Sequence, residues 1–170
     1  MIPVTPRVRR VKPVCGDRAT EISTDRKGDF AFLISGAPGV SEGSVTTTIP
    51  SARLLYPGES VDVSIRPRDG YTLEALGRAV RESGGVVFEN YELWIRHGQQ
   101  AHMVASFERN GPDHPRQIVW SGDLDGDLRP DVLFDFPLGD AGANYVLFLS
   151  SAGTRNQLVS QASTFATPGC

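Results

Sequence analysis

The 170-residue sequence lacks the long apolar runs, the basic excess and the internal repeats that mark several large classes of protein. No run approaches the roughly 20 apolar residues that cross a bilayer, so we expect no transmembrane segment. The formal net charge of −3 argues against a nucleic-acid-binding surface. No segment recurs at a fixed period, which excludes a multi-bladed propeller built from this chain alone. The basic N-terminus has no apolar stretch behind it, so no leader is expected in this sequence.

Recognisable catalytic motifs are also missing. The sequence has no phosphate-binding loop, dinucleotide fingerprint, nucleophile elbow or zinc-protease motif. The three histidines, His97, His102 and His114, have no partner at metal-ligand spacing. Glu89 and Glu92 are a candidate carboxylate pair, but three positions apart in a strand they fall on opposite faces. We therefore predict that the protein is not an enzyme.

Cysteine is scarce, with Cys15 near the start of the expected domain and Cys170 as the last residue. A disulfide between them would tie the ends together and contribute about 4–5 kcal/mol on the chain-entropy model. The alternative is two unrelated thiols, although a free cysteine at an exposed C-terminus is open to oxidation. We favour the disulfide, which is typical of periplasmic or extracellular proteins.

The most informative stretch is the acidic loop at residues 122–131. Aspartates fill loop positions 1, 3, 5 and 9, and position 7 offers a backbone carbonyl; in order these residues are Asp123, Asp125, Asp127, Asp131 and Arg129. Carboxylates this close repel one another, and a calcium ion, which takes about six to eight oxygen ligands, removes that repulsion. Gly126 lets the chain curl around an ion. The pattern predicts Ca²⁺ binding; the alternative is an acidic surface turn that binds nothing.

The loop is not an EF-hand. That motif has a glycine at position 6 and a glutamate at position 12, where this chain has Leu128 and Phe134. Apolar runs at residues 118–120 and 132–134 flank the loop and favour strands. The prediction is therefore a strand–loop–strand site.

Short alternating runs between Gly and Pro turns dominate the rest of the chain. Expected strands cover residues 30–34, 45–56 (interrupted by Pro50), 61–66, 145–149 and 158–165. The run at 145–149 is continuously apolar, which indicates a strand covered on both faces. We predict an all-β fold, an antiparallel sandwich or barrel with at most one short helix.

A hairpin is expected around His97-Gly98, the turn between two alternating runs. The alternating positions are Tyr91, Leu93 and Ile95 before the turn and Ala101, Met103, Ala105 and Phe107 after it. Trp94 falls on the face opposite Leu93, where it either packs or anchors a partner.

Residues 71–85 fit two structures. Leu73, Leu76 and Val80 share a helical face, whereas Tyr71, Leu73 and Ala75 alternate as in a strand. Both possibilities stay open. Residues 1–14 hold four basic residues and no acid, and we expect an extended basic tail before a single β domain at 15–170.

The acidic loop resembles the calcium loops of FG-GAP and VCBS-type repeats, which usually read G-D-x-[DN]-G-D-G-x-x-D. The matching positions are Gly122, Asp123, Asp125, Gly126, Asp127 and Asp131, and Leu128 replaces a glycine. Residues 117–170 also resemble bacterial envelope proteins with one such loop, an L-F-L-S-S strand (147–151 here) and a final cysteine. Some proteins of this kind are similar to periplasmic lysozyme inhibitors and serve as immunity proteins.

The resemblance implies a calcium-binding envelope protein that inhibits a peptidoglycan hydrolase by binding it. It assigns no partner-binding residue in this chain. A calcium-dependent adhesion or carbohydrate-binding module is the alternative, and an unrecognised hydrolase is the third possibility. A projecting loop would favour the inhibitor, an aromatic groove the glycan binder, and a deep polar cleft the enzyme.

Overall fold

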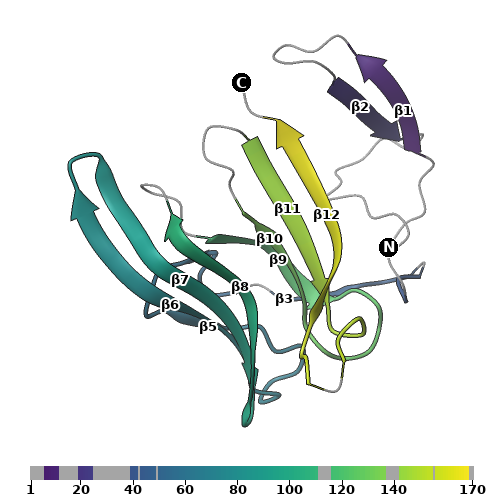
Figure 1. The fold of residues 1–170 in the computed structure, drawn as a ribbon. Coiled ribbons are helices and arrows are strands. Elements are labelled where there is room, and N and C mark those ends of the chain that lie inside the picture. The colour runs from purple at the N-terminus through teal and green to yellow at the C-terminus, as the bar shows by residue number, and fades with distance from the viewer. Residues whose placement is uncertain are drawn as a thin grey trace.

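The computed structural model describes residues 6–11, 19–24, 39–41, 43–48, 50–110, 116–136, 142–154 and 156–168 (Figure 1). These residues form antiparallel strands and no helix, so none of them forms a helix that could cross a membrane. The predicted all-β class is confirmed. The expected strand at 30–34, His114 and both cysteines lie outside the described residues.

The first large sheet has four strands in the order β5-β6-β7-β8. Its strands are β5 (Ser60–Asp62), β6 (Tyr71–Glu82), β7 (Gly85–His97) and β8 (Gln100–Asn110). The expected strand at 61–66 therefore ends early. The carboxylate of Asp62 accepts a hydrogen bond from the backbone N–H of Ser64 at 2.7 Å, which starts a turn before Arg66.

The second large sheet has six strands, ordered β12-β11-β10-β9 with β3 and β4 both along the far edge of β9. Its strands are β3 (Thr46–Thr48), β4 (Leu54–Leu55), β9 (Arg116–Asp123), β10 (Asp131–Asp135), β11 (Gly142–Leu149) and β12 (Ser160–Pro168). The predicted run at 45–56 becomes two short strands, since Pro50 cannot donate a ladder hydrogen bond.

A separate hairpin precedes both sheets. Strand β1 (Pro6–Val11) pairs with β2 (Ala19–Thr24) over six residues. Residues 6–11 of the expected basic tail at 1–14 thus form a strand that is paired with residues 19–24.

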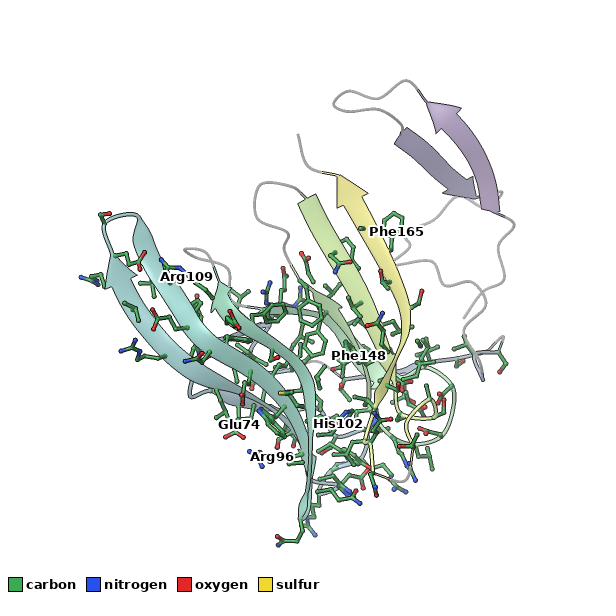
Figure 2. The ribbon with its side chains drawn as sticks, in the orientation of Figure 1. Glu74, Arg96, His102, Arg109, Phe148 and Phe165 are labelled. Atoms are coloured by element: carbon green, nitrogen blue, oxygen red, sulfur yellow. The ribbon has the colours of Figure 1, made fainter. Side chains whose placement is uncertain are left out.

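The two large sheets share a core to which both contribute apolar side chains. The four-stranded sheet supplies Leu73, Tyr91 and Ile95, and the six-stranded sheet supplies Phe134 and Phe148 among others. Phe148 is labelled in Figure 2. Tyr91 is fully buried and its hydroxyl donates to the carbonyl of Leu55 at 3.1 Å. The molecule is therefore a two-sheet sandwich.

The six-stranded sheet has a second core on its other face. Leu124, Leu133, Leu147 and Leu149 form this cluster, and Val40 and Val45 among others pack against it. Within β11, Val146 and Phe148 face the first core, while Leu147 and Leu149 face the second. Cover on both faces explains the continuous apolar run of β11 and confirms that prediction.

The ambiguous segment at 71–85 is mostly strand β6. Tyr71, Leu73 and Ala75 are buried with a period of two, and pairing with β5 and β7 outweighs the helical spacing. Gly77, with a φ of +137°, marks a bulge in the β6–β7 ladder. A Cβ there would lie 3.0 Å from the carbonyl oxygen of Glu89, so the bend requires glycine.

The expected hairpin at 91–107 is confirmed, with one correction to the alternation. Ala105 pairs with Leu93, but Met103 pairs with Trp94, because Val104 is an extra residue in a bulge. Met103 therefore lies on the outer face and is 43% exposed. Because the extra residue interrupts the alternation, Met103 and Ala105, on either side of it, lie on opposite faces of the sheet.

Candidate metal centre

The acidic loop joins two neighbouring antiparallel strands inside the six-stranded sheet. Strand β9 ends at Asp123, β10 begins at Asp131, and Asp131 lies opposite Gly122 in the ladder. Leu124 inserts into the second core and fixes the start of the loop. The structure thus has the predicted strand–loop–strand arrangement.

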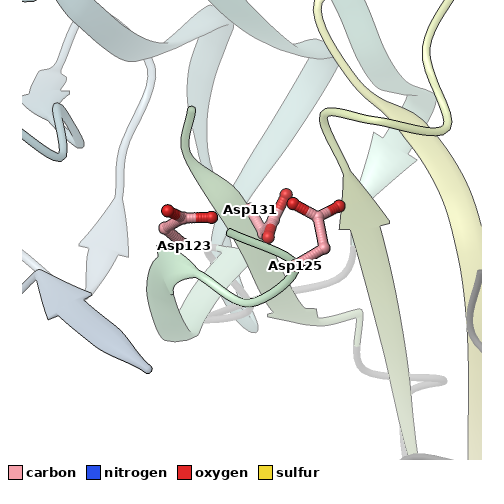
Figure 3. Close-up of side chains that lie close together, drawn as sticks. All are labelled: Asp123, Asp125 and Asp131. Carbon is pink, nitrogen blue, oxygen red and sulfur yellow. The ribbon is translucent and has the colours of Figure 1, made fainter. Parts of the chain in front are cut away.

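Three carboxylates converge in this loop. Asp123, Asp125 and Asp131 each place one oxygen within 4.8 Å of the other two (Figure 3). Asp131 is fully buried and Asp123 nearly so. Within the described part of the chain, no Lys or Arg forms an ion pair with these residues. The cluster is a concentration of negative charge that could hold a metal ion.

Asp123 organises the loop backbone. One of its oxygens accepts the N–H groups of Gly126 at 2.8 Å and Asp127 at 3.1 Å, and the other accepts that of Leu128 at 3.1 Å. The chain therefore wraps around this carboxylate. The first of these oxygens already accepts two hydrogen bonds, whereas the second accepts one and keeps a lone pair for a cation.

Two loop residues have left-handed backbone conformations. Gly126 has a φ of +83° and Leu128 a φ of +64°. A left-handed conformation costs a residue with a side chain roughly 1–2 kcal/mol. Leu128 stands at the position where the calcium loops that this sequence resembles usually have glycine, and it adopts a left-handed conformation while 51% exposed. The loop keeps its curl despite this substitution.

Asp131 is tied to two other segments. Its oxygens accept the backbone N–H of Leu124 at 2.7 Å and that of Ser150 at 2.8 Å, and the Ser150 hydroxyl lies 3.0 Å away. Burial raises the pKa of Asp131 to about 7, although the two backbone N–H donors act to lower it. Near neutral pH, either a proton or a bound cation can therefore neutralise this buried carboxyl.

Asp127 lies apart from the three converging carboxylates. Both of its oxygens contact the hydroxyl of Ser150, at 3.0 and 2.9 Å, and one accepts the N–H of Arg129 at 2.9 Å. Asp125 similarly accepts a hydrogen bond from Ser151. The structure thus brings together three of the predicted ligands, Asp123, Asp125 and Asp131, and leaves Asp127 in contact with Ser150.

Sequence reasoning missed the serines that follow β11. Ser150 and Ser151 come next in the chain after Leu149, at the end of β11, which pairs with β10. The sequence signal for these serines is their position, since both follow directly after a buried strand. The segment around Gly39 also lies beside the acidic loop. A Cβ added to Gly39 would be 3.5 Å from the Cβ of Asp125.

Gly122 allows the strands around the loop to pack closely. A Cβ on Gly122 would lie 2.2 Å from the carbonyl oxygen of Thr46 and 2.5 Å from the indole of Trp120. Thr46 of β3 pairs with Asp123, so β3 flanks the start of the loop. The glycine before the first aspartate is therefore a packing requirement.

The other candidate residues are engaged elsewhere. Glu89 pairs with Arg78, and Glu92 accepts the indole N–H of Trp94 at 2.9 Å. His97 stacks on the ring of Tyr71 with centroids 4.0 Å apart. The structure does not bring these groups to the acidic loop as ligands.

Comparison of the chain with protein-family models, with curated proteins and with solved structures finds no match.

Proposed function

We propose that this protein is a calcium-binding β-sandwich of the bacterial envelope that inhibits a peptidoglycan hydrolase by binding it. The observation that carries the calcium part is the convergence of Asp123, Asp125 and the buried Asp131. Three carboxylates that form no ion pair with a described Lys or Arg are costly in a protein interior unless a cation or a proton compensates them.

Calcium suits this donor set better than softer metals. The converging atoms are all carboxylate oxygens, with no sulfur or imidazole among them. An irregular loop that offers several carboxylates meets the flexible geometry of calcium more readily than the strict octahedron of magnesium. In the proposal Asp127 turns from Ser150 toward the ion, and the carbonyl of Arg129 completes the ligand set.

The proposed role of the ion is structural. The cluster joins the ends of β9 and β10, and hydrogen bonds connect it to Ser150 and Ser151 after β11. An ion held there would stabilise the folded state by linkage, since the unfolded chain has no preformed site.

Calorimetric titration with calcium and magnesium, together with melting curves in calcium and in chelator, tests this part. We expect calcium to raise the melting temperature, and Asp123→Asn to remove that response. Glu108→Gln removes one exposed carboxylate of β8 and is the matched control. No calcium response in the unaltered protein would mean that the loop is only an acidic turn.

The inhibitor part is supported by the resemblance of residues 117–170 and by the sandwich architecture. The test is a titration of the protein against a panel of lysozymes and other cell-wall hydrolases, in calcium and in chelator. Stoichiometric inhibition of one enzyme is the expected result. Cleavage of peptidoglycan by the protein alone, or glycan binding that chelator abolishes, would replace the inhibitor with one of the two other functions.

A further inference from the structure

The β6–β7 hairpin runs past the rest of its sheet. The last pair between β7 and β8 is Phe88 opposite Asn110. Beyond it, among the residues that the structure describes, β6 and β7 pair only with each other, from Val80–Val87 to Glu82–Gly85. Figure 1 shows this end of the hairpin standing away from the other labelled strands. Residues 81–84 at its tip are all exposed.

The projecting end is braced by ion pairs. Arg109 of β8, which is labelled in Figure 2, donates to both carboxylate oxygens of Glu82, at 2.8 and 2.7 Å. Arg78 pairs with Glu89 on the same face. At the base, Phe88 is buried and packs against the rings of Tyr56 and Tyr91. These contacts favour the paired form of the hairpin before any partner arrives, which reduces the entropy cost of binding.

The pairing leaves one charge uncompensated at the tip. Glu82 and Glu89 are each matched by an arginine, whereas the exposed Arg81 forms no ion pair within the described residues. The tip therefore presents a positive charge, although the whole chain carries −3. A narrow cationic projection is complementary to a concave acidic surface.

We infer that the tip of the β6–β7 hairpin, with Arg81 as its charged contact, enters an acidic cleft of the partner. The inference rests on the proposed function. Most glycoside hydrolases place a pair of carboxylates beside the scissile bond, so their substrate cleft is both concave and acidic. Arg81 supplies the guanidinium that pairs with such carboxylates in a two-pronged geometry.

The test uses the full chain and the hydrolase that it inhibits. Arg81→Glu reverses the tip charge, and Arg53→Glu makes the same change at an exposed arginine next to β4 in the other sheet. Gly84→Trp adds bulk without disturbing the fold, since a Cβ there meets no atom within 4 Å. Melting curves verify that all three variants fold.

We expect Arg81→Glu and Gly84→Trp each to weaken inhibition by about 100-fold or more, and Arg53→Glu to change it by less than about threefold. Raising the ionic strength should slow association of the unaltered protein but not of Arg81→Glu. Unchanged inhibition by both tip variants would overturn the role of the tip while the inhibitor function stands. Failure of the unaltered protein to inhibit any hydrolase would overturn both.

Discussion

The hydroxyl of Ser150 lies 3.0 Å from a carboxylate oxygen of Asp131 and within the same distance of both oxygens of Asp127. A hydroxyl has one proton and can donate it to only one acceptor at a time. When both carboxylates are ionised, one of these contacts is therefore oxygen against oxygen. A proton on Asp131 or a cation between the carboxylates relieves that repulsion.

The stability of the metal-free protein should fall as the pH rises toward neutrality. The pKa of Asp131 is about 7 in the folded protein, above its ordinary value of 3.8, so the folded state retains a proton that the unfolded chain releases. The free energy of unfolding should decrease as the pH rises from the ordinary pKa to about 7. Melting in chelator across this range measures the slope, and saturating calcium should remove most of it.

Asp131→Asn is the control for that pH dependence, because other groups also contribute. Burial raises the pKa of Asp135, which adds a slope of the same sign, and lowers the pKa of His102, which adds one of the opposite sign. A slope that is the same in Asp131→Asn as in the unaltered protein would contradict the assignment to Asp131.

Ser150→Ala should destabilise the metal-free protein by about 1–3 kcal/mol, because it removes the hydroxyl that the buried Asp131 and the half-buried Asp127 share. Calcium should restore much of this loss, since the ion would replace the hydroxyl as the partner of Asp127. Ser151→Ala, at an exposed residue, should cost less than about 0.5 kcal/mol. Denaturant unfolding with and without calcium gives both values, and equal losses from the two substitutions would count against the central role of Ser150.

Leu128→Gly should stabilise the protein by about 0.5–1 kcal/mol and strengthen calcium binding, because glycine adopts a φ of +64° without steric cost. The exposed leucine loses little packing on removal. Leu128→Ala keeps a Cβ and should bring no such gain. Calorimetry and unfolding curves compare the two variants, and a gain from alanine as large as that from glycine would refute the conformational explanation.

Gly122→Ala should destabilise the protein by about 2 kcal/mol or more, because the added methyl group cannot fit between Thr46 and Trp120. Gly84→Ala, in open space at the hairpin tip, should be nearly neutral. Thermal unfolding distinguishes the two substitutions. Equal melting temperatures would mean that β3 moves away from β9 at little cost.

Much of the fold was predictable because it follows from side-chain alternation. The all-β class, the hairpin at His97-Gly98 and the doubly covered β11 came from the spacing of apolar residues alone. Bulges were not predictable in this way. The insertion at Val104 and the bend at Gly77 change which face a residue takes, and they depend on the partner strand.

The acidic loop was predictable as a unit but not in its internal contacts. The spacing correctly placed Asp123, Asp125 and Asp131 together. It could not show that Asp127 contacts Ser150, because that residue comes from a strand end 23 positions later in the chain. Contacts between segments distant in sequence are set by sheet order, which local patterns do not encode.

The position of the acidic loop between β9 and β10 also has a consequence for amide hydrogen exchange. These two strands have neighbours on both sides, β11 beyond β10 and the short strands β3 and β4 beyond β9. Their amides should exchange with solvent only when the whole sheet opens, whereas those of the β6–β7 tip should exchange by local fraying. Slow exchange would therefore mark the two strands that flank the acidic loop, and fast exchange the projecting end of the β6–β7 hairpin.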